Sequence, residues 1–346
     1  MKILHICWSL DNGGAENMLV DIINYLVKHE DVSLFIVNDR IDYSIFNRLD
    51  KRCHVKRMGR KEGDKNPFSL LNIYGYLLFH HFDIVHLHNP DMIKYLWLKR
   101  NYVRTVHNTN IGYQNYRWHK GIIAISESVK EDLESRGIHR SVVIDNGINF
   151  SLIKPNMRKE KNEVFRMIQV SRIYFGQKGQ DILVEAVKKV LSHGITNIHL
   201  DFIGTGQDID RLRQMIKDNR LEEYISLLGN KPREYIYEHL CDYDLFVQPS
   251  RFEGFGLTVA EAMGAKIPVL VSENEGPLAI IENGKYGFTF KNKSVDDCAG
   301  QIEKIMKAYP SKDFLESAYR HVHTLYNVDN TAQGYLDFYQ KILRNS

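Results

Sequence analysis

Two carboxylates beside a pair of glycines give the strongest chemical signal in the chain. Glu253 and Glu261 have seven residues between them, and Gly254 and Gly256 closely follow the first one. An apolar strand is predicted before this segment and a helix after it, so the turn lies at the carboxyl end of a strand. Glycine lets backbone N–H groups approach a ligand, and the helix N-terminus adds a partial positive charge. The spacing predicts a site for an anionic or hydroxyl-rich ligand, with the two glutamates holding opposite ends of one long molecule.

Two cations are expected at the same edge of the sheet. Arg172 ends a predicted strand and Lys178 begins a predicted helix, with Gly176 and Gly179 beside them. Arginine gives forked contacts to phosphate and lysine a point charge. A solvated surface cation is the usual interpretation for either residue alone, but the two together favour a diphosphate.

The first half of the chain offers weaker candidates. Gly13 and Gly14 occupy a predicted strand-to-helix turn that permits close approach to a phosphate or sugar, although such a pair is also an ordinary turn. The third glycine of the dinucleotide fingerprint is missing. His86 and His88 share one face of a predicted strand, where a structural role is expected. His107 stands at a strand exit and is the better functional candidate.

Metal chemistry is disfavoured by the ligand patterns. No Asp or Glu stands beside these histidines in zinc-ligand spacing. Asp242 and Asp244 have a D-x-D spacing that can hold a divalent cation, but an apolar strand follows them and offers no third ligand. We therefore expect a site without a metal or another cofactor.

Composition narrows the class of protein. The chain has 346 residues, enough for two domains, and 43% hydrophobic content, which is typical of a soluble globular protein. Lys and Arg total 46 against 43 for Asp and Glu, an excess too small for general nucleic-acid binding. The 4 cysteines form no C-x-x-C pair, which disfavours zinc and disulfide frameworks and favours a reducing cytoplasm. A strand pattern begins at once and long apolar runs are absent, so we expect neither a signal peptide nor a membrane span.

Strands alternate with helices along both halves of the chain. This alternation predicts an α/β protein of two Rossmann-like domains, each with a doubly wound parallel sheet, facing each other across a cleft. A polar stretch with a proline interrupts the pattern and is the predicted linker. We place the N-terminal domain at 1–153, the linker at 154–163, the C-terminal domain at 164–328, and a final helix at 329–346 that could cross back to the N-terminal domain.

In their order along the chain, these motifs resemble the retaining GT-B glycosyltransferases of family 4. The most specific part is the E-x7-E motif from Glu253 to Glu261. The other matching segments are weak singly but correctly ordered: residues 13–16, 105–107, 124–126, 202–206, and Arg172 with Lys178. The resemblance covers nearly the whole chain and implies a GT-B fold, with the acceptor on the first domain and a nucleotide sugar on the second.

The resemblance also implies a role for each matching residue. Glu261 would hold the ribose hydroxyls, and Glu253 would face the transferred hexose. Arg172 and Lys178 would neutralise the diphosphate, and His107 would lie beside the hexose from the first domain. The remaining donor contacts implied are Gly13, Gly14, Asn230, Lys231, Gly254, Phe255, Gly256 and Leu257.

One position departs from the pattern of the family. The resemblance leads us to expect an acidic residue where this chain has Ala279. Any role of that carboxylate is in doubt here, unless Glu275 or Glu282 compensates.

The function implied is metal-independent transfer of a hexose, with retention, from a nucleotide-diphosphate sugar. A UDP-sugar is favoured over a GDP-sugar, and the acceptor would be a hydroxyl of a growing polysaccharide or lipid-linked glycan, as in bacterial capsule, exopolysaccharide or lipopolysaccharide synthesis. Family members are described as reacting on one face of the sugar, so we name no nucleophile. The alternatives are a nucleotide-sugar epimerase or a sugar phosphorylase on the same fold, or a non-catalytic sugar-nucleotide-binding module.

A basic segment precedes a predicted apolar helix in the first domain. Its cations are Arg48, Lys51, Arg52, Lys56, Arg57, Arg60 and Lys61. Each basic residue near an anionic membrane contributes about 1 kcal/mol to binding. We therefore expect peripheral contact with the inner face of the cytoplasmic membrane, with a core helix and a solvated charged face as the equal alternative.

Overall fold

The chain forms two compact units. The computed structural model describes residues 1–11, 13–64, 66, 70–89, 92–96, 98–107, 116–157, 163–273 and 275–345. Unit 1 comprises Met1–Gly147 and Val328–Ser346, and unit 2 comprises Ile148–Asn327. The sequence placed the division at 153 and a linker at 154–163, of which residues 158–162 lie outside the described residues.

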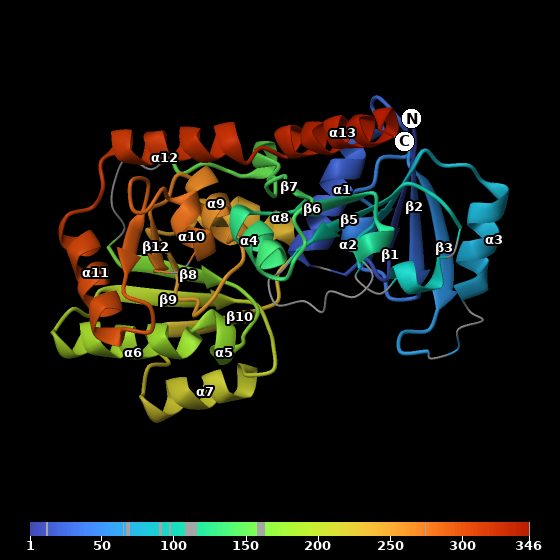
Figure 1. Ribbon diagram of the computed structural model, residues 1–346. Coiled ribbons are helices and arrows are strands. Elements are labelled where there is room, and N and C mark those ends of the chain that lie inside the picture. The colour runs from blue at the N-terminus through green and yellow to red at the C-terminus, as the bar shows by residue number, and fades with distance from the viewer. Residues whose placement is uncertain are drawn as a thin grey trace. The chain divides into compact units, whose positions relative to one another are not determined.

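The described part of unit 1 contains a parallel sheet in the order β3-β2-β1-β4-β5-β6-β7 (Figure 1). Its strands are β1 Lys2–Cys7, β2 Asp31–Asn38, β3 His54–Arg60, β4 Ile84–Leu87, β5 Tyr102–Val106, β6 Gly121–Ala124 and β7 Ser141–Val143. Its α-helices are α1 Gly14–Leu26, α2 Tyr43–Phe46, α3 Leu71–Phe79, α4 Glu127–Ser135 and α13 Val328–Arg344. The strand order reverses between β1 and β4, and ligands of such sheets bind at the carboxyl ends of the strands that flank this reversal.

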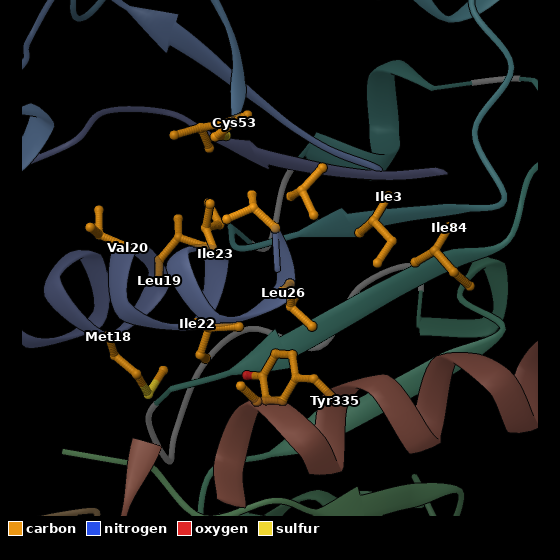
Figure 2. Packing of buried hydrophobic residues seen from close by; sticks show 14 of the residues in the cluster. Ile3, Met18, Leu19, Val20, Ile22, Ile23, Leu26, Cys53, Ile84 and Tyr335 are labelled. Carbon is orange, nitrogen blue, oxygen red and sulfur yellow. The ribbon is translucent and has the colours of Figure 1, made fainter. Parts of the chain in front are cut away.

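Helices α1 and α13 cover one face of this sheet. Apolar side chains recur along α1 at helical spacing and share a buried core with Ile3 and Ile84 of the strands. Figure 2 shows Ile22 and Leu26 of α1 near Tyr335 of α13 in this core. A segment from the end of the sequence therefore completes the core of the first unit.

Glycines let α13 approach the sheet closely. A Cβ atom at Gly121 would lie 2.6 Å from side-chain carbons of Phe338 and Ile342, and one at Gly147 would lie 2.5 Å from the Cα of Val328. Real Cβ atoms essentially never approach other heavy atoms this closely. Both positions therefore require glycine as long as α13 packs where it does.

A buried polar network joins α13 to the strands. His86 Nδ1 is hydrogen-bonded to the hydroxyl of Tyr339, and its Nε2 lies 2.8 Å from Thr105 Oγ1. Thr105 Oγ1 in turn lies 2.9 Å from the hydroxyl of Tyr335. Both nitrogens of His86 thus have partners, which agrees with the structural role expected for this residue.

Histidines on or directly after two neighbouring strands, β1 and β4, stack beside this network. His5 Nδ1 lies 3.0 Å from His88 Nε2, and the rings of His86 and His88 are parallel to within 12°. Burial lowers the pKa of His5 to about 3, and burial together with Arg104 lowers the pKa of His107 to about 4. Burial also lowers the pKa of His86 and His88 well below the ordinary value. These rings are therefore neutral at physiological pH.

Unit 2 contains a parallel sheet in the order β10-β9-β8-β11-β12-β13. Its strands are β8 Phe165–Val170, β9 Ile198–Ile203, β10 Ile225–Gly229, β11 Leu245–Gln248, β12 Val269–Ser272 and β13 Phe288–Phe290. Its α-helices are α5 Phe175–Lys178, α6 Gln180–Ser192, α7 Ile209–Asp218, α8 Arg233–His239, α9 Leu257–Gly264, α10 Glu275–Ile280, α11 Val295–Lys307 and α12 Lys312–Leu325. Helices α6, α7 and α11 share one buried core with the strands. The order reverses between β8 and β11, so the carboxyl ends of these two strands form the switch point of this unit.

The predicted α/β class with two doubly wound parallel sheets is confirmed. Among the described residues, no helix is long and apolar enough to cross a membrane.

We expect unit 1 to lose stability in acid. In the unfolded chain His5 takes up a proton near its ordinary pKa of 6.5, but in the folded unit only near about 3. The contribution of neutral His5 to the stability of unit 1 is therefore fully present above pH 6.5 and is lost as the pH falls toward 3. Each buried histidine contributes a slope of about 1.4 kcal/mol per pH unit in this window. Urea unfolding followed by tryptophan fluorescence measures the effect, because all 3 tryptophans fall within unit 1.

Substitution separates this effect from general acid sensitivity. His5→Asn should flatten the slope by about one histidine's contribution. His81→Asn is the matched control, because the His81 side chain is 76% exposed. If His5→Asn and the wild type lost stability equally between pH 6.5 and 5, the buried histidines would not be the cause; His107→Asn provides a second test if His5→Asn fails to fold.

Candidate functional site

The loop between β11 and α9 carries the predicted motif at the switch point of unit 2. Gly256 caps α9 with φ 101°, a left-handed conformation that glycine adopts without strain, and it forms no side-chain cap. The ring of Phe255 is buried edge-on against Tyr326 at 5.3 Å. A Cβ atom at Gly254 would meet nothing within 4 Å. The loop is thus anchored by Phe255 and open at Gly254, and it leads into the half-buried Leu257 at the helix start.

Glu253 is held by three donors on one of its oxygens. Its Oε2 accepts hydrogen bonds from Lys178 Nζ, from Gln248 Nε2 at 3.0 Å and from Ser250 Oγ at 3.5 Å. The side chains of Lys178 and Glu253 are only 13% and 16% exposed, so solvent screens this ion pair less than a surface pair. Among the described residues the other oxygen, Oε1, has no partner. Glu253 is therefore fixed in orientation with one oxygen available to a ligand hydroxyl.

Gly179 allows the loop after β8 to reach the loop after β11. It has φ 66°, and a Cβ atom there would lie 2.0 Å from the carbonyl oxygen of Pro249. Since Lys178 directly precedes Gly179, this close approach brings the ammonium group to Glu253.

Two buried amides hold the loop after β8 in place. Gln169 Nε2 donates to Ser171 Oγ at 3.1 Å and to the carbonyl of Lys178 at 3.0 Å. Gln180 Nε2 donates to the same hydroxyl at 3.0 Å and to the carbonyl of Arg172 at 3.0 Å. The backbone of Arg172 is thereby fixed, while its side chain is exposed and has no hydrogen-bond or ion-pair partner among the described residues.

A bidentate ion pair reinforces the same two loops. Arg251 donates to both oxygens of Asp181, at 2.9 and 2.7 Å, and its own N–H donates to the carbonyl of Gln177 at 2.7 Å. The hydrogen bonds to Asp181 raise the pKa of Arg251, so its charge is permanent. Forked pairs of this kind fix geometry as well as adding energy.

Glu261 lies further along α9 and contacts a buried tyrosine. Its Oε1 accepts a hydrogen bond from the hydroxyl of Tyr237 at 2.7 Å. Burial and the adjacent Glu261 carboxylate raise the pKa of Tyr237 well above its ordinary value. The Arg233 guanidinium stacks on the Tyr237 ring at 4.7 Å. Tyr237 therefore orients Glu261 as a permanent donor.

The predicted base contacts follow β10, at the same sheet edge but two strands from β8. Gly229 has φ 70° and its carbonyl accepts a hydrogen bond from Gly204 N–H at 2.9 Å. Beyond it, Asn230 is exposed, and Lys231 Nζ lies 5.0 Å from the ring centre of Tyr235. The contacts of these side chains are thus with solvent and Tyr235.

The segment around Ala279, which departs from the family pattern, packs against the backbone of the loop between β11 and α9. A Cβ atom at Gly276 would lie 2.6 Å from the carbonyl oxygen of Glu253 and 2.7 Å from the N of Phe255. Ala279 is exposed, and Glu282 is paired with Lys285 at 2.7 Å. The side chain of Glu275 lies outside the described residues. Glu282 is therefore engaged in an exposed ion pair with Lys285.

In unit 1 the predicted residues lie at carboxyl ends of strands. Gly13 caps α1 after β1, where a Cβ atom would lie 2.2 Å from Oε2 of Glu16, and Gly14 is the first residue of that helix. Burial raises the pKa of Glu16. His107 directly follows β5, and its ring centre lies 6.3 Å from that of His88.

The D-x-D pair, Asp242 and Asp244, makes structural contacts at the amino ends of the strands of unit 2, away from the motif loop. Asp244 Oδ2 accepts a hydrogen bond from the N–H of Arg166 at 2.8 Å, next to the start of β8. Asp242 Oδ2 lies 2.9 Å from His239 Nδ1. Both carboxylates precede β11, so they lie at its amino end, whereas Glu253 follows its carboxyl end.

The structure therefore brings together the residues predicted on the loops after β8 and β11: Arg172, Lys178, Glu253, Gly254, Phe255, Gly256 and Leu257. Glu261, Asn230 and Lys231 lie on other elements of the same unit, and Gly13, Gly14 and His107 belong to unit 1. Sequence analysis missed the support from Gln169, Gln180, Gln248 and the Arg251–Asp181 pair. The signal available for Gln169 and Gln248 was a polar residue directly after an apolar run of the same strand.

Two family profiles match consecutive parts of the chain. The profile described as "Glycosyltransferase Family 4" matches residues 12–152, and the one described as "Glycosyl transferases group 1" matches residues 152–321. The second match contains every predicted site residue of unit 2.

Individual proteins show the same similarity. An uncharacterized glycosyltransferase of Methanocaldococcus jannaschii is 27% identical over 185 residues, which are 54% of this chain and 49% of that protein. Poly(ribitol-phosphate) alpha-N-acetylglucosaminyltransferase of Staphylococcus aureus is 25% identical over 226 residues, 63% of this chain and 43% of that protein. The matches thus span about half the length of these relatives. The structure of Anabaena HepE in complex with UDP-glucose has a TM-score of 0.82 at 19% identity and covers 99% of this chain and 100% of that one. This likeness agrees with the predicted GT-B fold.

Replacement of two glycines of the site by alanine should affect the stability of unit 2 differently: a loss at Gly179 and almost no change at Gly254. Gly179→Ala places a Cβ atom against Pro249 and forces a left-handed φ on alanine, so we expect unit 2 to lose about 1–3 kcal/mol of stability or more. Gly254→Ala is the matched control, because its Cβ atom meets nothing within 4 Å. Urea unfolding followed by circular dichroism measures both. Equal stability of the two variants would refute the close approach of the two loops.

Proposed function

We propose that this chain, which belongs to the glycosyl transferases of group 1, moves a hexose from a nucleotide-diphosphate sugar to a hydroxyl of a glycan with retention of configuration. The observation that carries the proposal is the pairing of Lys178 with Glu253 at the switch point of unit 2, where Lys178 and the exposed Arg172 both lie in the segment that follows β8. This arrangement has a polar carboxylate oxygen for a sugar and a net positive charge for a diphosphate at one sheet edge.

The charges suit the leaving group of such a reaction. A diphosphate gains negative charge as the bond to the sugar breaks, and fixed cations stabilise that charge without reorganisation. Arg172 supplies one cation, Lys178 another, and the N-terminus of α9 behind Gly256 supplies a partial positive charge. The proposed reaction therefore needs no metal ion at this site.

Glu253 is a positioning group for the sugar in this proposal rather than a nucleophile. Three donors hold Oε2 of Glu253 and fix the orientation of the carboxylate, as a positioning group requires. The free Oε1 suits a hydrogen bond from a hexose hydroxyl. Retention then follows from attack and departure on one face of the sugar.

Glu261 and its neighbours suit the nucleoside end of the donor. A carboxylate accepts hydrogen bonds from the paired hydroxyls of a ribose, and Tyr237 fixes its orientation. Asn230 and Lys231 would border the base. HepE of Anabaena, which has a similar fold, was solved with UDP-glucose, and this supports uridine as the base to test first. A UDP-sugar is therefore the preferred donor, with glucose or N-acetylglucosamine as the first hexoses to test.

The competing functions differ from a transferase in what they do with the nucleotide sugar. An epimerase would return an isomerised donor, a phosphorylase would need inorganic phosphate, and a binding module would bind UDP without consuming any donor. Product analysis after incubation with UDP-glucose or UDP-N-acetylglucosamine and a glycan panel, with and without inorganic phosphate, distinguishes all of them. Transfer to an acceptor hydroxyl is the expected outcome.

Arg172→Ala should lower kcat for the best donor by about 10²–10³-fold, because it removes a cation from the developing diphosphate charge. Hydrolysis of UDP-sugars in the absence of acceptor measures this directly. Arg213→Ala is the control, since Arg213 is 63% exposed on α7. Unchanged turnover by Arg172→Ala would refute the diphosphate assignment.

A further inference from the structure

Helix α3 is apolar on two opposite sides. Ile73 and Leu77 are 3% and 0% exposed and pack into the core on the second face of the sheet. Leu71, Leu78 and Phe79 point away from this core and are 56%, 52% and 88% exposed. A helix that is apolar all round is normally covered on every side. The outer side of α3 is therefore suited to contact something beyond the chain itself.

Carboxylates neutralise several of the cations in the predicted basic segment. Three of its arginines are paired with carboxylates: Arg48 with Asp21 at 2.7 Å, Arg52 with Asp50 at 2.7 Å and Arg60 with Asp64 at 3.9 Å. The remaining acid of the segment, Glu62, lies 3.1 Å from Arg40. These pairs compensate one another. The excess charge is left on the lysines and on Arg57, which contacts the hydroxyl of Tyr43 and the ring of Phe46.

Three lysines line the edge strand beside α3. Lys51, Lys56 and Lys61 are exposed, and none of their ammonium groups has a hydrogen-bond or ion-pair partner among the described residues. Lys56 stands two residues before Met58, which packs against the core under α3, so by strand alternation both side chains lie on the α3 face of the sheet. Lys51 precedes β3 and Lys61 follows it, so the lysines span its length.

We propose that this surface, formed by Leu71, Leu78 and Phe79 with Lys51, Lys56 and Lys61, docks on an anionic lipid membrane. Exposed apolar side chains enter the interface between head groups and acyl chains, and lysines beside them attract anionic head groups. This combination requires both an apolar and an anionic partner, which a bilayer provides in one layer.

A second copy of the chain is the weaker occupant. A two-fold symmetric contact would bring each lysine row near its own copy, and like charges facing each other oppose association. A nine-residue helix also offers few apolar side chains toward the roughly 1,200–2,000 Å² that stable protein interfaces bury. The lipid surface meets neither objection.

Membrane docking needs no sugar donor, so it can fail or succeed independently of the proposed transferase function. If both hold, unit 1 lies at the bilayer, and a lipid-linked acceptor becomes the favoured class.

Flotation with vesicles tests the proposal on the full chain. Vesicles of phosphatidylcholine and phosphatidylglycerol in equal parts should bind the protein at low salt, and pure phosphatidylcholine should bind it far less. Lys51→Gln with Lys56→Gln and Lys61→Gln should weaken binding by about tenfold or more, and so should Leu78→Ser with Phe79→Ser. All of these side chains are exposed, and tryptophan-monitored urea unfolding confirms that the variants fold.

Matched substitutions elsewhere control for charge and hydrophobicity. Lys217→Gln with Lys304→Gln and Lys312→Gln removes three exposed lysines of unit 2, and Leu325→Ser removes a side chain that is 49% exposed. Both controls should bind vesicles like the wild type. Equal binding by every variant, or no binding by the wild type, would overturn the proposal. A dimer in sedimentation that Phe79→Ser disrupts, without vesicle binding, would assign the surface to a second copy. UDP-sugar hydrolysis without vesicles reports the transferase function separately.

Discussion

The contact between Lys178 and Glu253 joins the two loops on which the candidate site depends. One residue follows β8 and the other follows β11, and these strands are neighbours only because the sheet reverses its order between them. Gly179 makes the contact sterically feasible. The forked ion pair of Arg251 with Asp181 is a second contact between the same two chain segments. Removing one partner of this largely buried ion pair would leave an uncompensated charge, which is destabilising. The glycine and the second ion pair both help to keep Lys178 and Glu253 together.

This pairing also changes how the two cations differ. The charge of Lys178 is already matched by a carboxylate, whereas Arg172 has no partner among the described residues. A diphosphate at this edge would therefore find its uncompensated attraction in Arg172, while Lys178 would be shared between Glu253 and the ligand. Arginine and lysine are not equivalent here, because only the guanidinium presents a planar fork to phosphate oxygens.

Sequence reasoning recovered the fold because parallel sheets have a strong pattern. Apolar runs such as residues 245–247 and helices with apolar faces fixed the alternation, and glycines with left-handed φ such as Gly256 marked the strand exits. It missed β13, because Phe288–Phe290 is a short strand that pairs only at the sheet edge. Short segments depend on neighbours distant in sequence, which local patterns do not record.

The site was predictable only where it is local in sequence. The spacing of Glu253 and Glu261 was visible, but the partners of these glutamates are not near them along the chain: Lys178 precedes Glu253 by 75 residues, and Tyr237 precedes Glu261 by 24. The same limit applied to the basic segment, where the arginine–carboxylate pairs separate compensated charges from free lysines. Charge counts along a sequence give no information on which ions neutralise each other.

The position of α13 has a consequence for the order in which the chain can fold. All strands of unit 1 are synthesised before unit 2, but the residues of α13 that bury Ile22 and Leu26 emerge only after unit 2 is complete. Until then, the apolar face beneath α13 and the buried ring nitrogen of His86 that bonds Tyr339 are uncovered. On the ribosome, unit 2 can therefore reach its native packing first, while the earlier unit waits with an exposed surface of the kind that chaperones bind.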